Sequence, residues 1–550
     1  MSGGSTATAG RAATPAPPAA FADASLRPWQ RQALAAANEW RSGAFLIAAA
    51  PGAGKTRPAL ILARELLRRG EIDRVAIVCP TAPLTRQWAE AAGRLGLQLE
   101  PDASHLRTPG DFQGIAVTYA RAAASAATYA KECTARTLVV ADEVHHLGDE
   151  LAWGAGFKKA FAKAGRQLLL SGTPFRSDDA PIPGISYDAS GFAVPDVAYS
   201  YAEAIRDEAC REVVFVPFDG TLVWQSGEDT IESSFGEELS SKERARRYRT
   251  AISTEFAQGL PRILRRADQQ LTRARADGHK DAAGLVIAAD SEHARVVAKA
   301  LAEIAGEKPT IVLHAESGAH ERLRKFSAGR SRWIVAVNMV SEGVDIPRLR
   351  VGVYATTAKT AMIFRQIVGR FTRTGSGPPP SEQSWLFMPG EGILRAHADR
   401  IEEEIQRVTR KGPGEEEWDE PPDRLETERS ETEIDFVPVA ADVVPQMNLF
   451  GEAGGEDVQP TAAPVPVIAP NPDEVEEEPR GVPAYQRRRD LRAERHRLIS
   501  ELARKRRWQH SQANAWINGK VGISRVDDAT IDQLQKSCDL LVAELIRASR

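Results

Sequence analysis

The chain of 550 residues carries 71 Lys and Arg against 75 Asp and Glu, so it has room for several domains and a formal net charge of only -4. Its four cysteines lie far apart, and its apolar runs fall short of the ~20 residues of a membrane helix, which excludes disulfide-stapled and membrane-spanning classes. We expect a cytoplasmic protein whose residues 1–23, small and Pro-rich, form a disordered tail and not a signal peptide.

From about residue 24, short apolar runs alternate with amphipathic Ala, Leu and Arg stretches. Such runs, bounded by turn residues, are typical of buried parallel strands joined by crossover helices. The runs of the first half are AFLIAAA (44–50), VAIVCP (75–80), GIAVTYA (114–120), TLVVADE (137–143) and QLLLSGT (167–173). The pattern returns after a polar stretch as GLVIAAD (284–290), PTIVLHA (309–315), RWIVAVN (332–338) and LRVGVYAT (349–356). Two α/β domains in tandem are predicted.

The charge is unevenly distributed beyond residue 400. Residues 401–479 hold 23 Asp and Glu against 5 Lys and Arg, whereas residues 480–550 hold 8 against 16. The acidic, Pro-rich part buries too little apolar surface to offset its chain entropy, and it predicts a disordered linker. The basic part predicts a pair of helices, the second capped by Asp527 or Asp528. The predicted units are a tail (1–23), a first α/β domain (24–217), a helical connector (218–275), a second α/β domain (276–400), the disordered linker (401–485) and a basic helical module (486–550).

AAAPGAGKT, residues 48–56, follows a predicted strand and precedes a predicted helix. Glycines in such a loop let successive N–H groups converge on phosphate oxygens at the helix N-terminus, with Lys55 at the β- and γ-phosphates and Thr56 at Mg²⁺. The strict pattern has Gly where this chain has Ala49, so a merely flexible loop is the alternative. The predicted cofactors are ATP and Mg²⁺, bound by Pro51, Gly52, Ala53, Gly54, Lys55 and Thr56.

LVVADEVHH, residues 138–146, places two carboxylates and two histidines directly after a strand. At the carboxyl end of that strand Asp142 would hold Mg²⁺ and Glu143 would polarise the attacking water. A zinc site is the alternative, but it needs histidines four apart on one helix face, whereas His145 and His146 are neighbours. Trp88 is expected to pack in the core and not to stack on bases.

DEVHH together with APGAGKT resembles motifs II and I of superfamily 2 helicases, in the DEAD/DEAH grouping that includes type III restriction subunits and excision-repair helicases. The resemblance covers about residues 24–400 and implies two tandem RecA-like domains. LRPWQRQAL (26–34) resembles the Q motif, in which Gln30 and Arg27 contact adenine. PTAPLTRQW (80–88) resembles motif Ia, VTYA (117–120) resembles motif Ic, and SGTPFR (171–176) resembles motif III. The resemblance implies nucleic-acid contacts for Pro80, Thr81, Arg86, Thr118 and Asn338, and coupling roles for His145, Ser171 and Thr173.

In the second domain SEGVDIP (341–347) resembles motif V and QIVGRFTR (366–373) resembles motif VI. The resemblance implies that Gly343 and Asp345 lie near the ribose and that Gln366 places the attacking water. It further implies that Arg370 and Arg373 reach the γ-phosphate, the catalytic set being completed by Lys55, Asp142 and Glu143. An exposed surface pair is the alternative for the two arginines.

The expected function is an ATP-dependent DNA helicase or translocase in repair, replication or defence. Two alternatives stay open: an RNA helicase, and a partner-bound ATPase switch that remodels complexes without unwinding. Residues 443–455 form an apolar island in the acidic segment, in which Gln446, Met447, Leu449 and Phe450 resemble the bacterial sliding-clamp peptide. A chance hydrophobic cluster is the alternative there. The basic tail from Arg487 to Arg507 would bind phosphates or simply be a solvated helix face.

Overall fold

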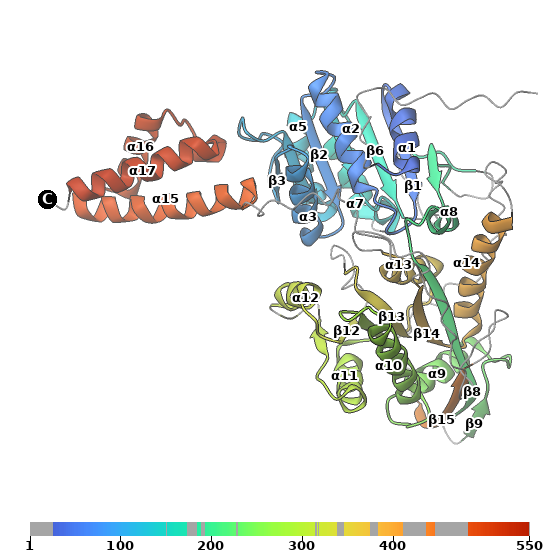
Figure 1. Cartoon of the computed structure of the whole chain (residues 1–550). Helices are drawn as coiled ribbons and strands as arrows, with labels where there is room; N and C mark the ends of the chain where they lie inside the picture. The colour runs from blue at the N-terminus through green and yellow to red at the C-terminus, as the bar shows by residue number, and fades with distance from the viewer. Residues whose placement is uncertain are drawn as a thin grey trace, which may run out of the picture.

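The computed structural model describes residues 26–149, 151–172, 184–188, 193–226, 229–313, 316, 318–337, 346–373, 383–410, 436–445 and 482–548. These residues form two α/β lobes, one above the other in Figure 1, and a helical arm that projects from the side of the first lobe. The two tandem parallel-sheet domains predicted from the sequence are therefore present.

The first lobe is built on a parallel sheet whose faces are both covered. The strand order is β3 (Leu99–Pro101), β4 (Gly114–Thr118), β2 (Arg74–Cys79), β5 (Thr137–Ala141), β6 (Arg166–Ser171), β1 (Gly43–Ala49) and β7 (Val197–Tyr199). Successive side chains of a strand point to opposite faces, so Ile77 and Val140 join one core while Val78 and Val139 join the other. On the first face lie α1 (Pro28–Glu39), α2 (Thr56–Arg68) and α3 (Ala82–Arg94); on the second lie α4 (Tyr119–Ala124), α5 (Ala126–Glu132) and α7 (Leu151–Phe161).

The second lobe has a sheet of mixed direction. Its order is β11 (Thr310–Val312), β12 (Trp333–Val337), β10 (Ala283–Ala288), β13 (Leu349–Ala355), β14 (Gln383–Pro389), β8 (Glu212–Ser226) and β15 (Val437–Pro445), with β9 (Asp229–Ser233) also pairing with β8. Only the pairings of β8 with β15 and β9 are antiparallel among those described. The helices of this lobe are α9 (Ser241–Ala251), α10 (Leu260–Ala276), α11 (Ser291–Ala305), α12 (Ala319–Ala328), α13 (Ala361–Phe371) and α14 (Gly392–Arg410).

Strand β8 differs from the predicted boundary at residue 217 and from the helical connector predicted over 218–275. It begins at Glu212, pairs with β14 and runs the length of the second lobe (Figure 1). Alternate residues such as Val213, Phe215, Leu222 and Trp224 are buried, as expected of a half-buried strand. The helical part of the prediction corresponds to α9 and α10 only.

The disordered linker predicted over 401–485 is wrong at two places. Helix α14 continues to Arg410, and β15 completes the edge of the second sheet. Ala441 and Val443 of β15 are buried, and β8 provides its hydrogen-bonding partners. The local composition predicts disorder because it contains no sign of the strand that stabilises β15. That strand, β8, lies more than 200 residues earlier in the chain. Residues 411–435 and 446–481 lie outside the described part.

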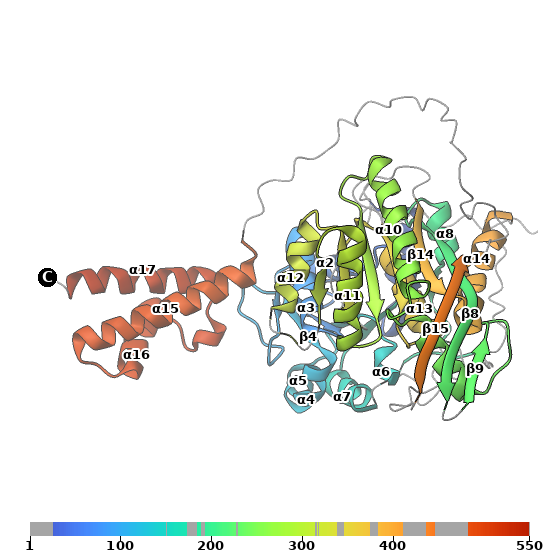
Figure 2. The same ribbon diagram turned by 90° about the horizontal axis from the view of Figure 1, so that it is seen from below.

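The arm, residues 482–548, contains α15 (Ala484–Arg506), α16 (His510–Val521) and α17 (Ile531–Arg547). α15 and α17 pack side by side around their own apolar cluster, as Figure 2 shows. The cap of α17 is not Asp527 or Asp528, which lie in a 3-10 turn, but Thr530, which forms a capping box with Gln533. In the described ranges, no helix combines the length and apolar character needed to cross a bilayer.

Candidate functional site

The loop between β1 and α2 has the backbone shape expected of a phosphate cradle. Gly52 and Gly54 have φ values of +85° and +90°, which glycine adopts without strain. Lys55 stands at the N-cap of α2, and its Nζ donates to Ala49 O at 3.0 Å and lies 3.9 Å from Glu143 Oε1. The loop therefore combines a backbone conformation that requires glycine, the N-terminus of a helix and one ammonium group. These three features suit the binding of a polyphosphate.

The two residues predicted to contact adenine brace this loop from outside. Gln30 is buried, and its Nε2 donates to Gly54 O at 2.9 Å while its Oε1 accepts from Arg27 N at 2.9 Å. Arg27 Nη1 donates to Ala53 O at 3.3 Å and to Ala209 O at 3.0 Å. Arg27 thereby joins the phosphate loop to the segment that leads into the second lobe.

Asp142 and Glu143 follow β5 and face the loop. Asp142 is buried and accepts hydrogen bonds from Trp88 Nε1 at 2.8 Å and from the backbone N–H of Glu143 at 3.1 Å. Trp88 is 2% exposed, so it packs as predicted and also holds the carboxylate. Glu143 has a φ of +50°, a rare backbone conformation outside glycine that is typical of functional sites, and its Oε2 accepts from Gly172 N at 3.2 Å.

The two carboxylates titrate in opposite directions. Burial, followed by the charge of Glu143, raises the pKa of Asp142 above its usual range. Burial acts in the same sense on Glu143, but the positive charges of Lys55, His145, His146 and Arg370 together hold the pKa of Glu143 below its usual range. A divalent cation fits beside Asp142, because its charge would offset the cost of burying this carboxylate. Thr56, the other predicted ligand of the ion, is the first residue of α2.

His145 connects motif II to the two segments predicted to couple with it. Its Nδ1 lies 3.4 Å from Ser171 Oγ, and its Nε2 lies 3.2 Å from Gln366 Nε2 of the second lobe. His145 therefore contacts both the end of β6 and helix α13. His146 packs against His145 with ring centroids 4.5 Å apart. Thr173 lies outside the described residues.

Helix α13 brings the second lobe against the loop. Thr372 Oγ1 donates to Pro51 O at 3.1 Å, and a side chain at Gly369 would collide with Pro51. A Cβ at Gly52 would lie 3.2 Å from Arg373 Cγ, which places that predicted arginine at the loop. Arg370 is close enough for its charge to act on Glu143. Both predicted arginines therefore lie at the loop and its carboxylates, not on a remote surface.

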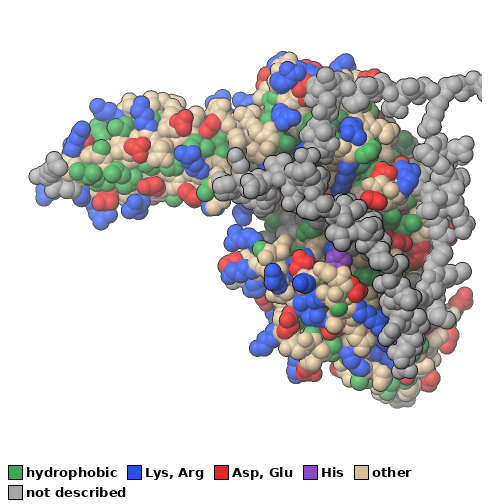
Figure 3. Space-filling model, in the orientation of Figure 1, with side chains coloured by type: hydrophobic (Ala, Val, Ile, Leu, Met, Phe, Trp, Pro, Cys, Tyr) green, Lys and Arg blue, Asp and Glu red, His purple; other side chains and the backbone are tan. Residues whose placement is uncertain are grey.

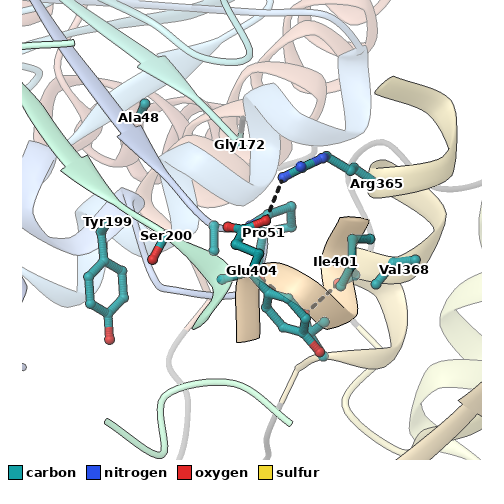
Figure 4. A pocket seen from close by; sticks show the side chains of 13 residues that line it. Ala48, Pro51, Gly172, Tyr199, Ser200, Arg365, Val368, Ile401 and Glu404 are labelled. Atoms are coloured by element: carbon teal, nitrogen blue, oxygen red, sulfur yellow. Dashed lines mark hydrogen bonds and ion pairs between the residues drawn. The ribbon is translucent and has the colours of Figure 1, made fainter. Parts of the chain in front are cut away.

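A pocket between the lobes opens beside this cluster (Figure 4). Pro51 and Gly172 line it from the first lobe, and Arg365, Val368 and Glu404 line it from the second. Arg365 Nη1 lies 3.3 Å from Glu404 Oε2, the dashed contact in the figure. The pocket therefore takes its lining from both lobes, next to the phosphate loop.

Comparison with known proteins matches each lobe to a family model. Residues 23–176 match "Type III restriction enzyme, res subunit", and residues 269–375 match "Helicase conserved C-terminal domain". An uncharacterized protein of Mycobacterium tuberculosis (strain ATCC 25618 / H37Rv) is 40% identical over 493 residues, 88% of this chain and 79% of the relative. An uncharacterized protein of Mycobacterium leprae (strain TN) is 40% identical over 430 residues, 76% of this chain and 71% of the relative.

The chain belongs to the superfamily 2 helicases. Membership implies ATP binding and hydrolysis, with Mg²⁺ as the usual ion. Among solved structures, a fragment of a putative type I restriction HsdR subunit from Vibrio vulnificus YJ016 shares 17% identity at a TM-score of 0.47, covering 68% of this chain and 65% of that one. Dbp5 of S. cerevisiae, bound to RNA and ADP BeF3, shares 14% at 0.44, covering 70% of this chain and 88% of that one.

Some residues of the helicase that are predicted to contact nucleic acid lie at the carboxyl ends of two neighbouring strands of the first sheet. Pro80 and Thr81 follow β2, and Thr118 ends the neighbouring strand β4 and caps α4. Arg86, on α3, lies 3.7 Å from Asp102. Asn338, also predicted to contact nucleic acid, lies outside the described residues. So do Gly343 and Asp345, predicted near the ribose, and the predicted clamp peptide 446–450.

One residue of the helicase that the sequence did not single out is Arg211. It is 2% exposed, and its guanidinium donates to Pro347 O, Leu349 O, Phe371 O and Ser384 Oγ at 2.9–3.3 Å. Its backbone N–H donates to Thr372 O at 2.6 Å. Arg211 therefore ties the segment after α8 (Tyr201–Arg206) to the ends of motifs V and VI. No local pattern marks it, because all these partners lie more than 130 residues away.

Proposed function

We propose that the helicase hydrolyses ATP between its lobes and uses the cycle to move along or unwind DNA. The observation that carries the proposal is that one cluster takes residues from both lobes: Lys55, Glu143 and His145 from the first, and Gln366 and Arg370 from the second. The match of residues 23–176 to a restriction-enzyme model supports DNA as the nucleic acid. Repair, replication or defence remains the predicted setting.

The chemistry follows from what each side chain holds. Backbone N–H groups of residues 52–56 and Lys55 would bind the phosphates, and Thr56 and Asp142 would hold the ion. When bound, ATP·Mg²⁺ supplies a phosphoryl group that passes to water. Glu143, ionised at neutral pH, orients that water and takes its proton. Arg370 and Arg373 stabilise the charge that spreads over the phosphoryl oxygens.

The contact between His145 and Gln366 links the chemistry to movement. Gln366 belongs to the second lobe, whereas His145 follows Glu143 by two residues and contacts Ser171. A change at Glu143 therefore reaches the strand end at Ser171 and the second lobe through one histidine. Opening of the lobes would break this hydrogen bond, and closure would restore it.

Glu143→Gln tests the catalytic assignment. We expect ATP binding to persist and DNA-stimulated turnover to fall by at least about a hundredfold, because the amide cannot accept a proton. Glu39→Gln, an exposed carboxylate at the end of α1, is the matched control and should behave as wild type. Retained turnover in Glu143→Gln would overturn the assignment.

The same assay separates the three functions. ATPase stimulation is measured with single-stranded DNA, duplex DNA and RNA, together with strand displacement. A DNA helicase responds to DNA and separates strands. Stimulation by RNA alone indicates an RNA helicase. Stimulation by DNA without strand displacement indicates a DNA translocase, and turnover that neither DNA nor RNA stimulates indicates a partner-bound switch.

The sliding-clamp contact through Gln446, Met447, Leu449 and Phe450 is proposed on the sequence pattern alone. The pattern begins directly after β15, which is held on the second lobe by β8. We expect a peptide of residues 441–454 to bind a bacterial clamp and to lose that binding with Leu449→Ala and Phe450→Ala. Equal binding by the two peptides, or none by either, would contradict this partner.

A further inference from the structure

The arm is fixed to the first lobe by specific polar contacts. Arg488 is 3% exposed, pairs with Glu100, donates to Asp527 O at 2.6 Å and lies over the Phe112 ring at 5.7 Å. Asp111 Oδ2 accepts from Ile531 N at 2.9 Å, so a carboxylate of the first lobe stabilises the N-terminus of α17. A buried guanidinium and a helix-end contact set the direction of the arm relative to the motor.

The attachment lies beside the segment predicted to touch nucleic acid. Tyr485 OH donates at 3.0 Å to Glu90 Oε1, which is one helical turn beyond Arg86 on α3. Burial, followed by Glu90, raises the pKa of Tyr485 to about 12, and the charges of Arg86 and Arg489 act on the same hydroxyl in the opposite sense. The first exposed arginines of the arm and the arginine of motif Ia therefore share one neighbourhood.

A row of basic side chains continues from that point along α15. Arg489, Arg497 and Arg504 are exposed and are spaced by eight and seven residues, about two helical turns each, so they share a face. The opposite face, which includes Leu491, Leu498 and Leu502, is packed in the core of the arm. The described arm holds 14 Lys and Arg against 8 Asp and Glu, a net charge of +6. Lys and Arg side chains line its edges in Figure 3.

We propose that the row formed by Arg489, Arg497 and Arg504, which we name the arm stripe, binds the sugar–phosphate backbone of nucleic acid engaged at α3. From Arg489 to Arg504 the helix rises fifteen steps of about 1.5 Å, about 22 Å in all, which corresponds to six or seven base pairs at about 3.4 Å each. The arm lengthens the contact of the motor with its track. This inference rests on the proposed function.

The test compares two charge reversals in the full-length protein. One variant carries Arg489→Glu, Arg497→Glu and Arg504→Glu. The matched control carries Arg525→Glu, Lys536→Glu and Arg547→Glu, which are also exposed on the arm and change the net charge equally. The Kd for duplex DNA, single-stranded DNA and RNA is measured over a range of salt, and ATPase activity is measured with and without nucleic acid.

We expect the stripe variant to bind about 10- to 100-fold more weakly and to lose about two to three from the slope of log Kd against log salt, with the control near wild type. ATPase without nucleic acid should be unchanged, because the stripe lies outside the nucleotide site. Equal loss in both variants means unspecific electrostatics and overturns the proposal, and so does no loss in either. If the arm stripe proposal fails but DNA still stimulates the wild-type ATPase, the proposed function stands. If the wild-type protein neither binds nucleic acid nor is stimulated by it, both the arm stripe and the proposed function are wrong.

Discussion

At the scale of single residues, two adjacent carboxylates acquire different chemistry from their neighbours. Asp142 is buried and accepts a hydrogen bond from Trp88, whereas the positive charges of Lys55 and Arg370 lower the pKa of Glu143. Burial therefore makes the charge of Asp142 costly in the absence of a cation, whereas the neighbours of Glu143 stabilise its charge. The pairing of Lys55 with Glu143 could be anticipated from the motifs, because both follow strands of one parallel sheet. The hydrogen bond from Trp88 to Asp142 could not be anticipated, because a tryptophan among apolar residues predicts only packing in the core.

Arg211 provides a residue-level prediction. Arg211→Met removes four side-chain hydrogen bonds to buried acceptors, and we expect it to lower the free energy of unfolding by about 2–4 kcal/mol. Stimulated kcat should fall about tenfold because the ends of motifs V and VI lose a common anchor, while ATP affinity, set mainly by residues 51–56, changes little. Thermal unfolding and steady-state kinetics measure both.

Arg206→Met is the control for Arg211, since it removes an arginine of α8 whose side chain is 41% exposed. Arg211→Lys separates charge from geometry, because one ammonium group cannot reach all four acceptors. If Arg211→Met and Arg206→Met unfold and turn over alike, Arg211 does not hold the two motifs.

At the scale of elements, helix α13 and strand β15 show opposite degrees of predictability. α13 carries motif VI, and its Gly369 permits contact with Pro51, so local sequence and tertiary packing agree. β15 lies within an acidic, Pro-rich segment, and only pairing with β8 makes it a strand. A strand needs a hydrogen-bonding partner, and a single sequence window does not contain it.

Helix α14 carries a pH-dependent element. Burial, followed by the charges of Asp399 and Glu212, raises the pKa of Glu402 to about 7. Because the folded state binds this proton more tightly than the unfolded chain does, the contribution to stability is full below about 4.5 and is lost as the pH rises through about 7. Glu402→Gln should therefore raise Tm at pH 8 by about 2–4 °C and have little effect near pH 4.5.

Thermal unfolding between pH 4.5 and 8 measures the effect of Glu402→Gln. The exposed neighbour Glu403→Gln serves as control and should shift Tm equally little at both ends. A Glu402 variant that gains no stability with rising pH would show that this carboxylate is solvated in the folded protein.

At the scale of the whole molecule, the two lobes are joined and the arm stands apart. The largest apolar cluster runs through both lobes, and Thr372 with Pro51, Gln366 with His145, and Arg27 with Ala209 cross or brace their boundary. The arm has its own core and reaches the first lobe chiefly through charged and polar groups. Polar attachments of this kind fix direction without merging cores, which suits a part that holds a track beside a motor.

The amino-acid sequence by itself determined the two α/β lobes, the phosphate loop and the order of the motifs. These features depend on local requirements: apolar runs for buried strands, glycines at positive φ, and functional side chains at strand ends. Only the tertiary structure decided the membership of β8 and β15 in the second sheet, the network around Arg211, the bond from Trp88 to Asp142 and the docking of the arm. Each of these joins residues far apart in the chain, and no local periodicity records which distant partner completes a buried hydrogen bond.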